Sequence, residues 1–332
     1  VMEGSWVSSI LEYARWVTNY PAHPALAQAE FDRAWLNHQA GNPARAFQLF
    51  TNYVVRFPTN QLAPVAQKWI ADHQFQSGKF IEAEQGYRRL FENTNLLANA
   101  PDMQWEARLS AGRSAFFRQE HAAAELLLAS VVNDTNAPIA ELARAEFYLG
   151  DVAADQTSRT PTNLLDALPH YQRVANEMPN SPLNPSAWGR MGDCHLQLGN
   201  LDSAAEAYRT VTELPSADVT TRSQAGLGMA HVLDKLAEAA GETEEREKLR
   251  KRSLEQCMEI VFGGNLRSAN EKLDPFWVKE AGLMAGRLAG RLGRAEQERK
   301  VYSRLAKELP GMPLWQAKLD ALRVKQETPK KP

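Results

Sequence analysis

The chain has 332 residues, a length that corresponds to about two ordinary domains. Its 38 Lys and Arg residues nearly balance its 40 Asp and Glu residues, and the net charge of −2 disfavours a nucleic-acid binder, which needs a basic surplus or a basic face. No apolar run approaches the roughly 18 residues of a membrane-spanning helix, and two cysteines, Cys194 and Cys257, are too few for a disulfide framework or a zinc site.

The N-terminal residues predict a helix that belongs to an incomplete unit. Val1 to Gly4 look like neither a translation start nor a signal peptide, so we expect a further segment upstream. Residues 5–20 are predicted to be helical. The spacing from Tyr13 to Pro21 equals that from Phe50 to Pro58, which makes this helix the second helix of a partial repeat, or a cap.

From residue 34 onward, small residues, glycines, aromatic residues and prolines recur at matching offsets. Gly41 and Gly78 stand 37 residues apart, and the clearest copy runs from Ala187 to Arg209 with a turn at Gly199. Each copy predicts two helices. A small residue in the first helix allows close approach, and an aromatic residue in the second fills the groove between neighbouring pairs. The predicted fold class is therefore all-α.

Several later copies depart from the pattern. The third has Gln119 in place of the turn glycine, and the fourth has a longer turn at 155–162. Pro169 stands near the start of the helix that is expected after this turn, so that helix must either start late or kink. Residues 236–252 lengthen the sixth copy, and their acidic residues precede their basic ones, which predicts a solvated helix pair rather than a docking surface. Residues 261–275 are predicted to be the loop that leads to the seventh copy.

The C-terminal residues predict a helix that closes the stack. Leu314 to Val324 has the pattern of a single capping helix, with Trp315 and Leu319 turned inward. Residues 326–332 are predicted to be a disordered tail.

One set of residues carries a family resemblance: Trp188, Met191, Gly192, Gly199, Ala204, Tyr208 and Pro215. The set resembles the tetratricopeptide repeat, whose period is 34 residues. The resemblance extends over nearly the whole chain, although the spacing between copies here is mostly longer. It implies a right-handed α-solenoid of about six or seven repeats, which we expect to form a single domain over residues 1–325.

The resemblance also implies a concave face, lined by the first helices, that contacts a partner protein or peptide. The inward positions of these helices are Phe31, Trp35, Gln39, Lys68, Asp72, Gln76, Arg113, Phe116, Phe117, Asp151, Asp155, Asp193, Gln197, Met229, Arg287 and Arg291. Aromatic residues and arginine are enriched in binding hot spots, but aromatic residues equally pack helix against helix. The carboxylate clamp of chaperone-binding members needs Asn where Asp72 follows Lys68, which disfavours a chaperone adaptor.

No catalytic constellation stands out in the sequence. None of the seven histidines has a partner at metal-ligand spacing, and we expect no metal, no cofactor and no enzymatic activity. Asp151, Asp155 and Asp193 are the best carboxylates for a hydrolase of the α/α-barrel type. Short, irregular repeats give no sign of the closure that such a barrel needs.

Two further hypotheses, about the role of the chain and its location, stay open. The chain could be a structural subunit that assembles with copies of itself or with a larger complex through its convex face and N-terminal helix, which would bury Trp6 and Trp16. The divergent repeats, rich in Gln and Asn, are similar to tetratricopeptide proteins of bacterial cell envelopes. That similarity implies a periplasmic or envelope location and an upstream signal or anchor, with a cytoplasmic location also open.

Overall fold

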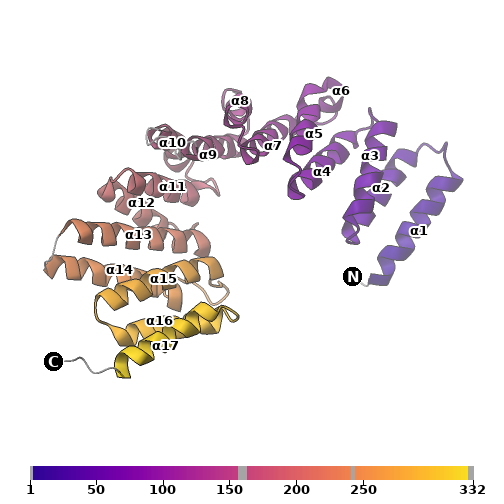
Figure 1. Cartoon of the computed structure of the whole chain (residues 1–332). Helices are drawn as coiled ribbons and strands as arrows, with labels where there is room; N and C mark the ends of the chain where they lie inside the picture. The colour runs from indigo at the N-terminus through magenta and orange to yellow at the C-terminus, as the bar shows by residue number, and fades with distance from the viewer. Residues whose placement is uncertain (1–2, 156–162, 241–243, 328–332) are drawn as a thin grey trace. The chain divides into compact units, whose positions relative to one another are not determined.

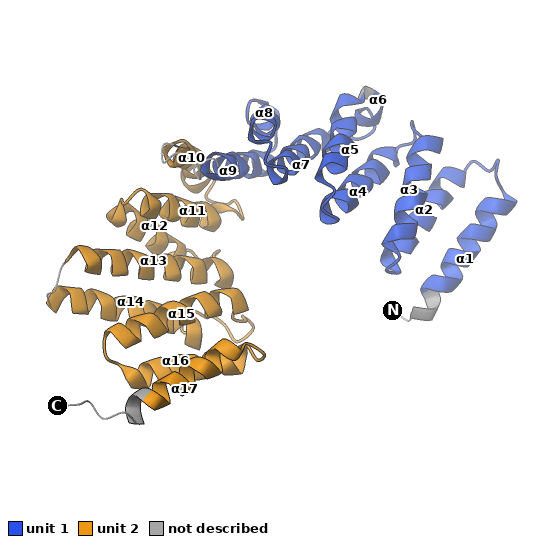
Figure 2. Ribbon diagram, in the orientation of Figure 1, with its two compact units in different colours: residues 1–156 blue, residues 157–332 orange. Residues whose placement is uncertain are grey.

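The computed structural model describes residues 3–155, 163–240 and 244–327, and helices connected by short turns make up nearly all of this part of the chain (Figure 1). No strand occurs within these ranges, so the predicted all-α fold is confirmed. The chain divides into two compact units, residues 1–156 and 157–332 (Figure 2). That one domain extends over residues 1–325 stays a prediction.

Unit 1 is a series of helices in which each long helix packs against the next long helix along the chain. Its helices are α1 (Glu3–Asn19), α2 (Leu26–Gln39), α3 (Pro43–Arg56), α4 (Ala63–Gln76), α5 (Phe80–Glu92), α6 (Thr94–Leu97), α7 (Met103–Phe117), α8 (His121–Val132) and α9 (Ile139–Asp155).

Unit 2 continues the same pairing of helices. It contains α10 (Asn163–Gln172), the π-helix η2 (Arg173–Glu177), α11 (Asn184–Gln197), α12 (Leu201–Glu213), α13 (Val219–Ala239), α14 (Glu244–Phe262), α15 (Pro275–Arg291), α16 (Ala295–Glu308) and α17 (Pro313–Glu327). The lengthened pair expected around residues 236–252 is formed by α13 and α14. Its charged residues make exposed pairs such as Lys251–Glu247 at 2.6 Å, as a solvated surface does.

The turns within the helix pairs share one backbone motif. Gly41, Gly78, Gly199 and Gly293 all have φ between 65° and 80°, the left-handed region that glycine enters without steric cost. The next amide then donates to the carbonyl five residues back, which closes the helix end in a Schellman motif. Gln119 has φ 62° and makes the same closure, and no other non-glycine among the described residues has a positive φ. It therefore replaces the turn glycine, as predicted.

Replacing Gln119 by glycine should stabilise the protein. A residue with a side chain in the left-handed region costs about 1–2 kcal/mol, and glycine removes this cost. Part of the gain is lost again, because glycine has more conformational freedom in the unfolded chain. We expect the free energy of unfolding to rise by up to about 1 kcal/mol in urea unfolding followed by far-UV circular dichroism. The matched control is Gln85→Gly, an exposed position inside α5, which should lose about 1 kcal/mol. A loss at both positions would contradict the backbone argument.

Glycines on first helices allow tyrosines to fill the grooves between pairs. The ring of Tyr208 on α12 is fully buried between α11 and α13. A Cβ placed on Gly192 would lie 2.6 Å from this ring, and one on Gly228 would lie 2.3 Å from it. Gly286 and Tyr302 repeat the arrangement on α15 and α16. The predicted role of the small and aromatic positions is thus observed.

Pro169 lies inside α10, seven residues into the helix. Its ring nitrogen has no hydrogen to donate to the preceding turn, and the chain passes into a π-helix over Arg173–Glu177. The Nδ2 atom of Asn184 donates to the carbonyls of Val174 and Ala175, at 3.3 and 2.7 Å, and so satisfies backbone groups of the irregular turn. The long turn predicted at 155–162 lies outside the described residues except for Asp155, the last residue of α9.

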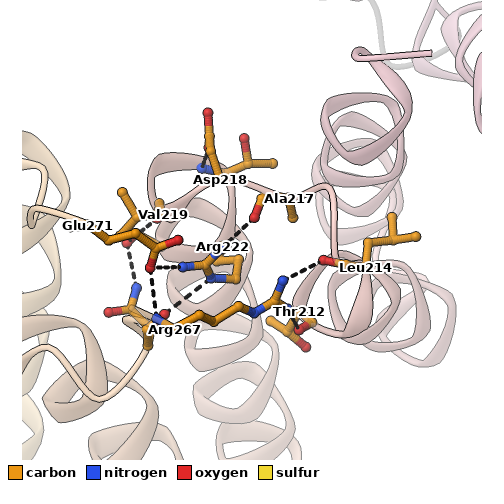
Figure 3. A network of polar contacts seen from close by, with 11 residues as sticks. Thr212, Leu214, Ala217, Asp218, Val219, Arg222, Arg267 and Glu271 are labelled. Atoms are coloured by element: carbon orange, nitrogen blue, oxygen red, sulfur yellow. Dashed lines mark hydrogen bonds and ion pairs between the residues drawn. The ribbon is translucent and has the colours of Figure 1, made fainter. Parts of the chain in front are cut away.

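A loop of residues 263–274 joins α14 to α15, where the sequence predicts a loop over 261–275. Figure 3 shows it fastened to α12 and α13 by two arginines. Arg222, on α13 and only 4% exposed, bonds the carbonyls of Ala217 and Asn265 and the carboxylate of Glu271. Arg267, in the loop, bonds the carbonyls of Leu214 and Thr212.

The C-terminal helix α17 covers the last helix pair. Trp315 is 1% exposed and Leu319 is half-buried against the same apolar cluster, as predicted for a cap. The helix continues to Glu327, beyond the expected end at Val324 and into the tail expected from residue 326. Residues 328–332 lie outside the described part of the chain.

Candidate functional site

The predicted contact residues all lie on α2, α4, α7, α9, α11, α13 and α15, the first helices of their pairs. Their environments differ widely. On α2, Trp35 and Gln39 are exposed, but Phe31 is buried with 9% exposure. Its ring packs edge-on against Phe50 and Tyr53, at 5.4 and 5.6 Å between centroids. Phe31 therefore belongs to the core of unit 1.

On α4, the two charged residues of the predicted set bind other residues of the protein. Lys68 Nζ lies 2.9 Å from Asp72 and 3.2 Å from Glu106 on α7. The hydroxyl of Tyr87 on α5 donates to Asp72 at 2.6 Å. Burial lowers the pKa of Lys68, but the bonds to Asp72 and Glu106 raise it by more, so the lysine stays charged. These groups fasten helices together.

Arg113 and Phe117 on α7 lie among partly buried aromatic residues from neighbouring helices. The Arg113 guanidinium is 5.1 Å from the ring centre of Phe75 and 5.0 Å from that of Tyr148, a cation–π contact on two rings. Phe117, 51% exposed, stacks on Phe80 at 5.2 Å. Unit 1 thus presents an aromatic patch with an arginine at its edge.

The remaining predicted residues of unit 1 lie near the ends of their helices. Phe116 is half-buried and its ring contacts His121 edge-on at 6.1 Å. His121 Nε2 lies 2.7 Å from the carboxylate of Asp155. Gln76 is exposed, and Asp151 is half-buried. His121 lies on a second helix, so it is not among the first-helix positions predicted from the sequence.

In unit 2, Asp193 links three helices. Its carboxylate accepts hydrogen bonds from the Tyr208 hydroxyl at 2.7 Å and from Gln224 Nε2 at 2.9 Å. Burial raises the pKa of Asp193. The two hydrogen bonds lower this pKa, but by less than burial raises it. Gln197 is exposed and Met229 is half-buried against the neighbouring core. Asp193 is thus a half-buried link between α11, α12 and α13.

A cavity of about 370 Å³ lies on the first helices of the last pairs. It is lined by Leu227, His231, Glu280, Leu283, Met284, Arg287, Tyr302 and Lys318. Within the described part of the chain, Arg287 and Lys318 make no hydrogen bond or ion pair, whereas Glu280 is paired with Lys279 at 3.0 Å. Burial lowers the pKa of His231, and the charge of Arg287 lowers it further. The cavity therefore combines an apolar wall with two free positive charges.

Arg287 was predicted from the sequence, whereas His231 and Lys318 were not. Lys318 lies on α17, one turn after Trp315. The helical spacing of these two residues in the sequence already indicates that Lys318 lies on the same side of the capping helix as Trp315. Arg291, one turn after Arg287, is paired with Asp234 at 3.5 Å, which also lies 3.9 Å from Arg250.

Nothing in the described ranges suggests a metal centre or a reactive thiol. No group of three or more His, Cys, Asp and Glu side chains there could hold a metal ion. Cys194 and Cys257 are buried and form no disulfide, and burial raises the pKa of the Cys257 thiol to about 12, which makes it a poor nucleophile. Among the helices that the structure describes, none has the length and apolar character to cross a bilayer.

Comparisons with known proteins agree with this architecture. Residues 162–218 match the family model of the tetratricopeptide repeat. The fold is similar to that of a tetratricopeptide repeat protein from Parabacteroides merdae (11% identity, TM-score 0.53, covering 90% of this chain and 98% of that one). It is also similar to the C-terminal part of a TPR repeat-containing protein from Cytophaga hutchinsonii (10% identity, TM-score 0.55, covering 87% and 99%). No curated protein is significantly similar to the chain.

The fold defines the class: an all-α helical repeat protein of the solenoid type. Within that class, residues 162–218 match the tetratricopeptide repeat, and the fold is similar to that of tetratricopeptide repeat proteins. Proteins of this class generally mediate protein–protein interactions and generally do so as non-catalytic scaffolds.

Proposed function

We propose that the chain is a non-catalytic scaffold whose first helices bind an acidic peptide segment of a partner protein, with the main contact in the cavity of α13, α15 and α17. The observation that supports this is the pair of free cations in the cavity, Arg287 and Lys318.

The chemistry of the cavity favours a carboxylate beside an apolar side chain. A guanidinium without an internal partner offers a forked donor to a carboxylate, and such charge-assisted bonds are stronger than neutral ones. Leu283 and Met284 add apolar area next to it, and Tyr302 adds an aromatic ring. Arginine and tyrosine are among the residues that dominate binding energy at interfaces. An acidic residue followed by an apolar one would satisfy both parts of the cavity.

Replacing Arg287 by alanine should weaken the binding of acidic peptides about tenfold or more, because the remaining lysine cannot make a forked contact. Peptides selected by the wild-type protein from a display library would be measured by isothermal titration calorimetry against both proteins. Lys300→Ala, which removes an exposed cation from α16, is the matched control and should leave binding unchanged. Selection of peptides without acidic residues, or equal affinity in the Arg287 variant, would contradict the proposal.

A further inference from the structure

Unit 2 contains two sets of three helices in matching register. The first set is α11, α12 and α13, and the second is α15, α16 and α17. Helices α12 and α16 begin at Leu201 and Ala295, and α13 and α17 begin at Val219 and Pro313, an interval of 94 residues in both cases. A residue of the first set therefore has its counterpart 94 positions further on, and the two sets can be compared side chain by side chain.

In the first set, one carboxylate holds the three helices together. Asp193 on α11 accepts hydrogen bonds from the hydroxyl of Tyr208 on α12, at 2.7 Å, and from Nε2 of Gln224 on α13, at 2.9 Å. Asp72 and Tyr87 make the same carboxylate–hydroxyl bond in unit 1, at 2.6 Å and with the same spacing of 15 residues. The arrangement of the first set is thus one acceptor between two donors.

In the second set, the same three positions contain three donors. Counting 94 residues on from the acceptor Asp193 leads to Arg287, and counting on from its two donors leads to Tyr302 and Lys318. Guanidinium and ammonium groups have hydrogens to donate and nothing with which to accept. Within the described ranges, none of these three side chains makes a hydrogen bond or an ion pair. The second set therefore keeps the donors of the first set and replaces its acceptor by a cation.

Tyr302 is the most enclosed of these donors. It is 3% exposed and lines the cavity of about 370 Å³. Its hydroxyl oxygen would lie 2.3 Å from a Cβ placed on Gly286, so the hydroxyl lies beside α15, one residue before Arg287. Burial, and then the charge of Glu298, raise the pKa of Tyr302 above its ordinary value of 10, so the hydroxyl keeps its proton. A buried hydroxyl without a partner is costly, which favours a bound acceptor.

The chain's own carboxylates do not take the place of Asp193 here. Glu280, the one carboxylate among the described residues that line the cavity, is paired with Lys279 at 3.0 Å. It also stands seven residues before Arg287, about two helical turns away. Of the residues outside the described ranges, Glu242 alone has a carboxylate side chain. Charge complementarity therefore favours a carboxylate from a partner.

We propose, in extension of the function proposed above, that the cavity binds one carboxylate group of the partner in the place that Asp193 takes in the first set. This carboxylate accepts a hydrogen bond from the Tyr302 hydroxyl and pairs with Arg287 and Lys318. Charge-assisted bonds of this kind are about twice as strong as neutral ones. Tyr302 then determines specificity, because its hydroxyl selects a hydrogen-bond acceptor rather than any negative charge near the two cations. The acidic character of the partner rests on the proposed function, and the role of Tyr302 is new.

The test uses the full protein, with its methionine methyl groups labelled with carbon-13, and small amides as probes. Met284 lines the cavity, and its methyl resonance, identified with Met284→Leu, reports binding. N-acetyl-aspartate N-methylamide should shift this resonance saturably, with a dissociation constant of about 1 mM, and the asparagine analogue should not. N-acetyl-alanine has its carboxylate at the chain end, so the tighter of the two acidic probes tells whether a side chain or a C-terminus supplies the group.

Replacing Tyr302 by phenylalanine should weaken the binding of the aspartate probe about tenfold, because a hydrogen bond to a charged group is lost. The matched control is Tyr208→Phe, which removes a hydroxyl that the chain itself uses. Tyr208→Phe should leave binding unchanged and lower the melting temperature by about 2–4 °C. Tyr302→Phe should leave the melting temperature unchanged. Glu242→Gln should change neither quantity.

A further variant compares the two sets without any ligand. Arg287→Asp supplies an acceptor at the position that corresponds to Asp193, so it should raise the melting temperature by about 2–4 °C and abolish binding of the aspartate probe. In the Tyr302→Phe background the rise should be smaller, because one of the two donors is gone.

Equal affinities of Tyr302→Phe and wild type for the aspartate probe would overturn this inference, and so would an absence of binding. A loss of thermal stability in Tyr302→Phe as large as that in Tyr208→Phe would show that the chain itself supplies the acceptor, and would also overturn it. Acidic peptides whose affinity depends on Arg287 but not on Tyr302 would support the proposed function alone. Binding of the aspartate probe that depends on Tyr302, with no acidic peptide selected from the library, would support this site and overturn the proposed function.

Discussion

Replacing Arg222 by alanine should lower the free energy of unfolding by about 3 kcal/mol, the largest single effect that we expect in this protein. The guanidinium is buried and bonds the carbonyls of Ala217 and Asn265 (Figure 3). Removing it leaves two backbone acceptors without their donor and opens a space under the loop 263–274. The bond to Glu271 is not counted in this figure, because that carboxylate is partly exposed.

Urea unfolding followed by circular dichroism would measure the loss, and hydrogen exchange of the α13 amides would locate it. The matched control is Arg267→Ala. Arg267 also bonds two backbone carbonyls, but it is exposed and water can replace it, so we expect a loss below about 1 kcal/mol. Equal losses in the two variants would show that burial of Arg222 does not govern its contribution.

The same contact predicts a dependence on pH. The bond from Arg222 lowers the pKa of Glu271 below its ordinary value of 4.5. A carboxylate with a lowered pKa in the folded state stabilises the protein above its unfolded pKa, and this contribution disappears as pH falls through the folded pKa. Acid titration of stability should therefore be less steep in Arg222→Ala than in wild type.

Replacing Gly228 by alanine should lower the free energy of unfolding by about 2 kcal/mol, although alanine is the better helix former. The new Cβ would lie 2.3 Å from Cζ of Tyr208. The ring cannot retreat, because Gly192 holds its other side and its hydroxyl is bonded to Asp193. The helices α11 and α13 must therefore separate.

Gly189→Ala is the matched control for this prediction. Gly189 lies inside α11, and a Cβ placed there meets no atom within 4 Å. The same substitution should thus stabilise the protein by up to about 1 kcal/mol. A second background, Tyr208→Leu, should reduce the cost of Gly228→Ala in a double-mutant cycle. Gains at both glycines would show that the ring does yield.

The sequence allows the helices to be predicted well because their signals are local. Turn glycines, the Gln119 substitution and the cap at Trp315 all depend on contacts within one or two helix pairs. Pro169 shows the limit of such reasoning. A proline predicts an irregular helix, but the π-helix that follows depends on Asn184, which comes from the next pair.

The candidate sites were predicted less completely. Register places Trp35, Arg113 and Arg287 on first helices, but it does not tell which charged residues are already paired. Asp193 has the pattern of a contact residue, yet Tyr208 and Gln224 use its carboxylate. Only coordinates show such pairing, because the partners come from helices that are distant in sequence.

The loop 263–274 alters how unit 2 can come apart. In a simple stack each helix pair touches only its neighbours, so pairs can fray one at a time from an end. Here Arg267 fastens the loop to the end of α12, and Arg222 fastens it to α13. Fraying that begins at α17 can release the helices after the loop, but the helices from α12 to α14 must then open together. We therefore expect the loop to join α12, α13 and α14 into one cooperative foldon, where the repeat pattern alone would leave separable parts.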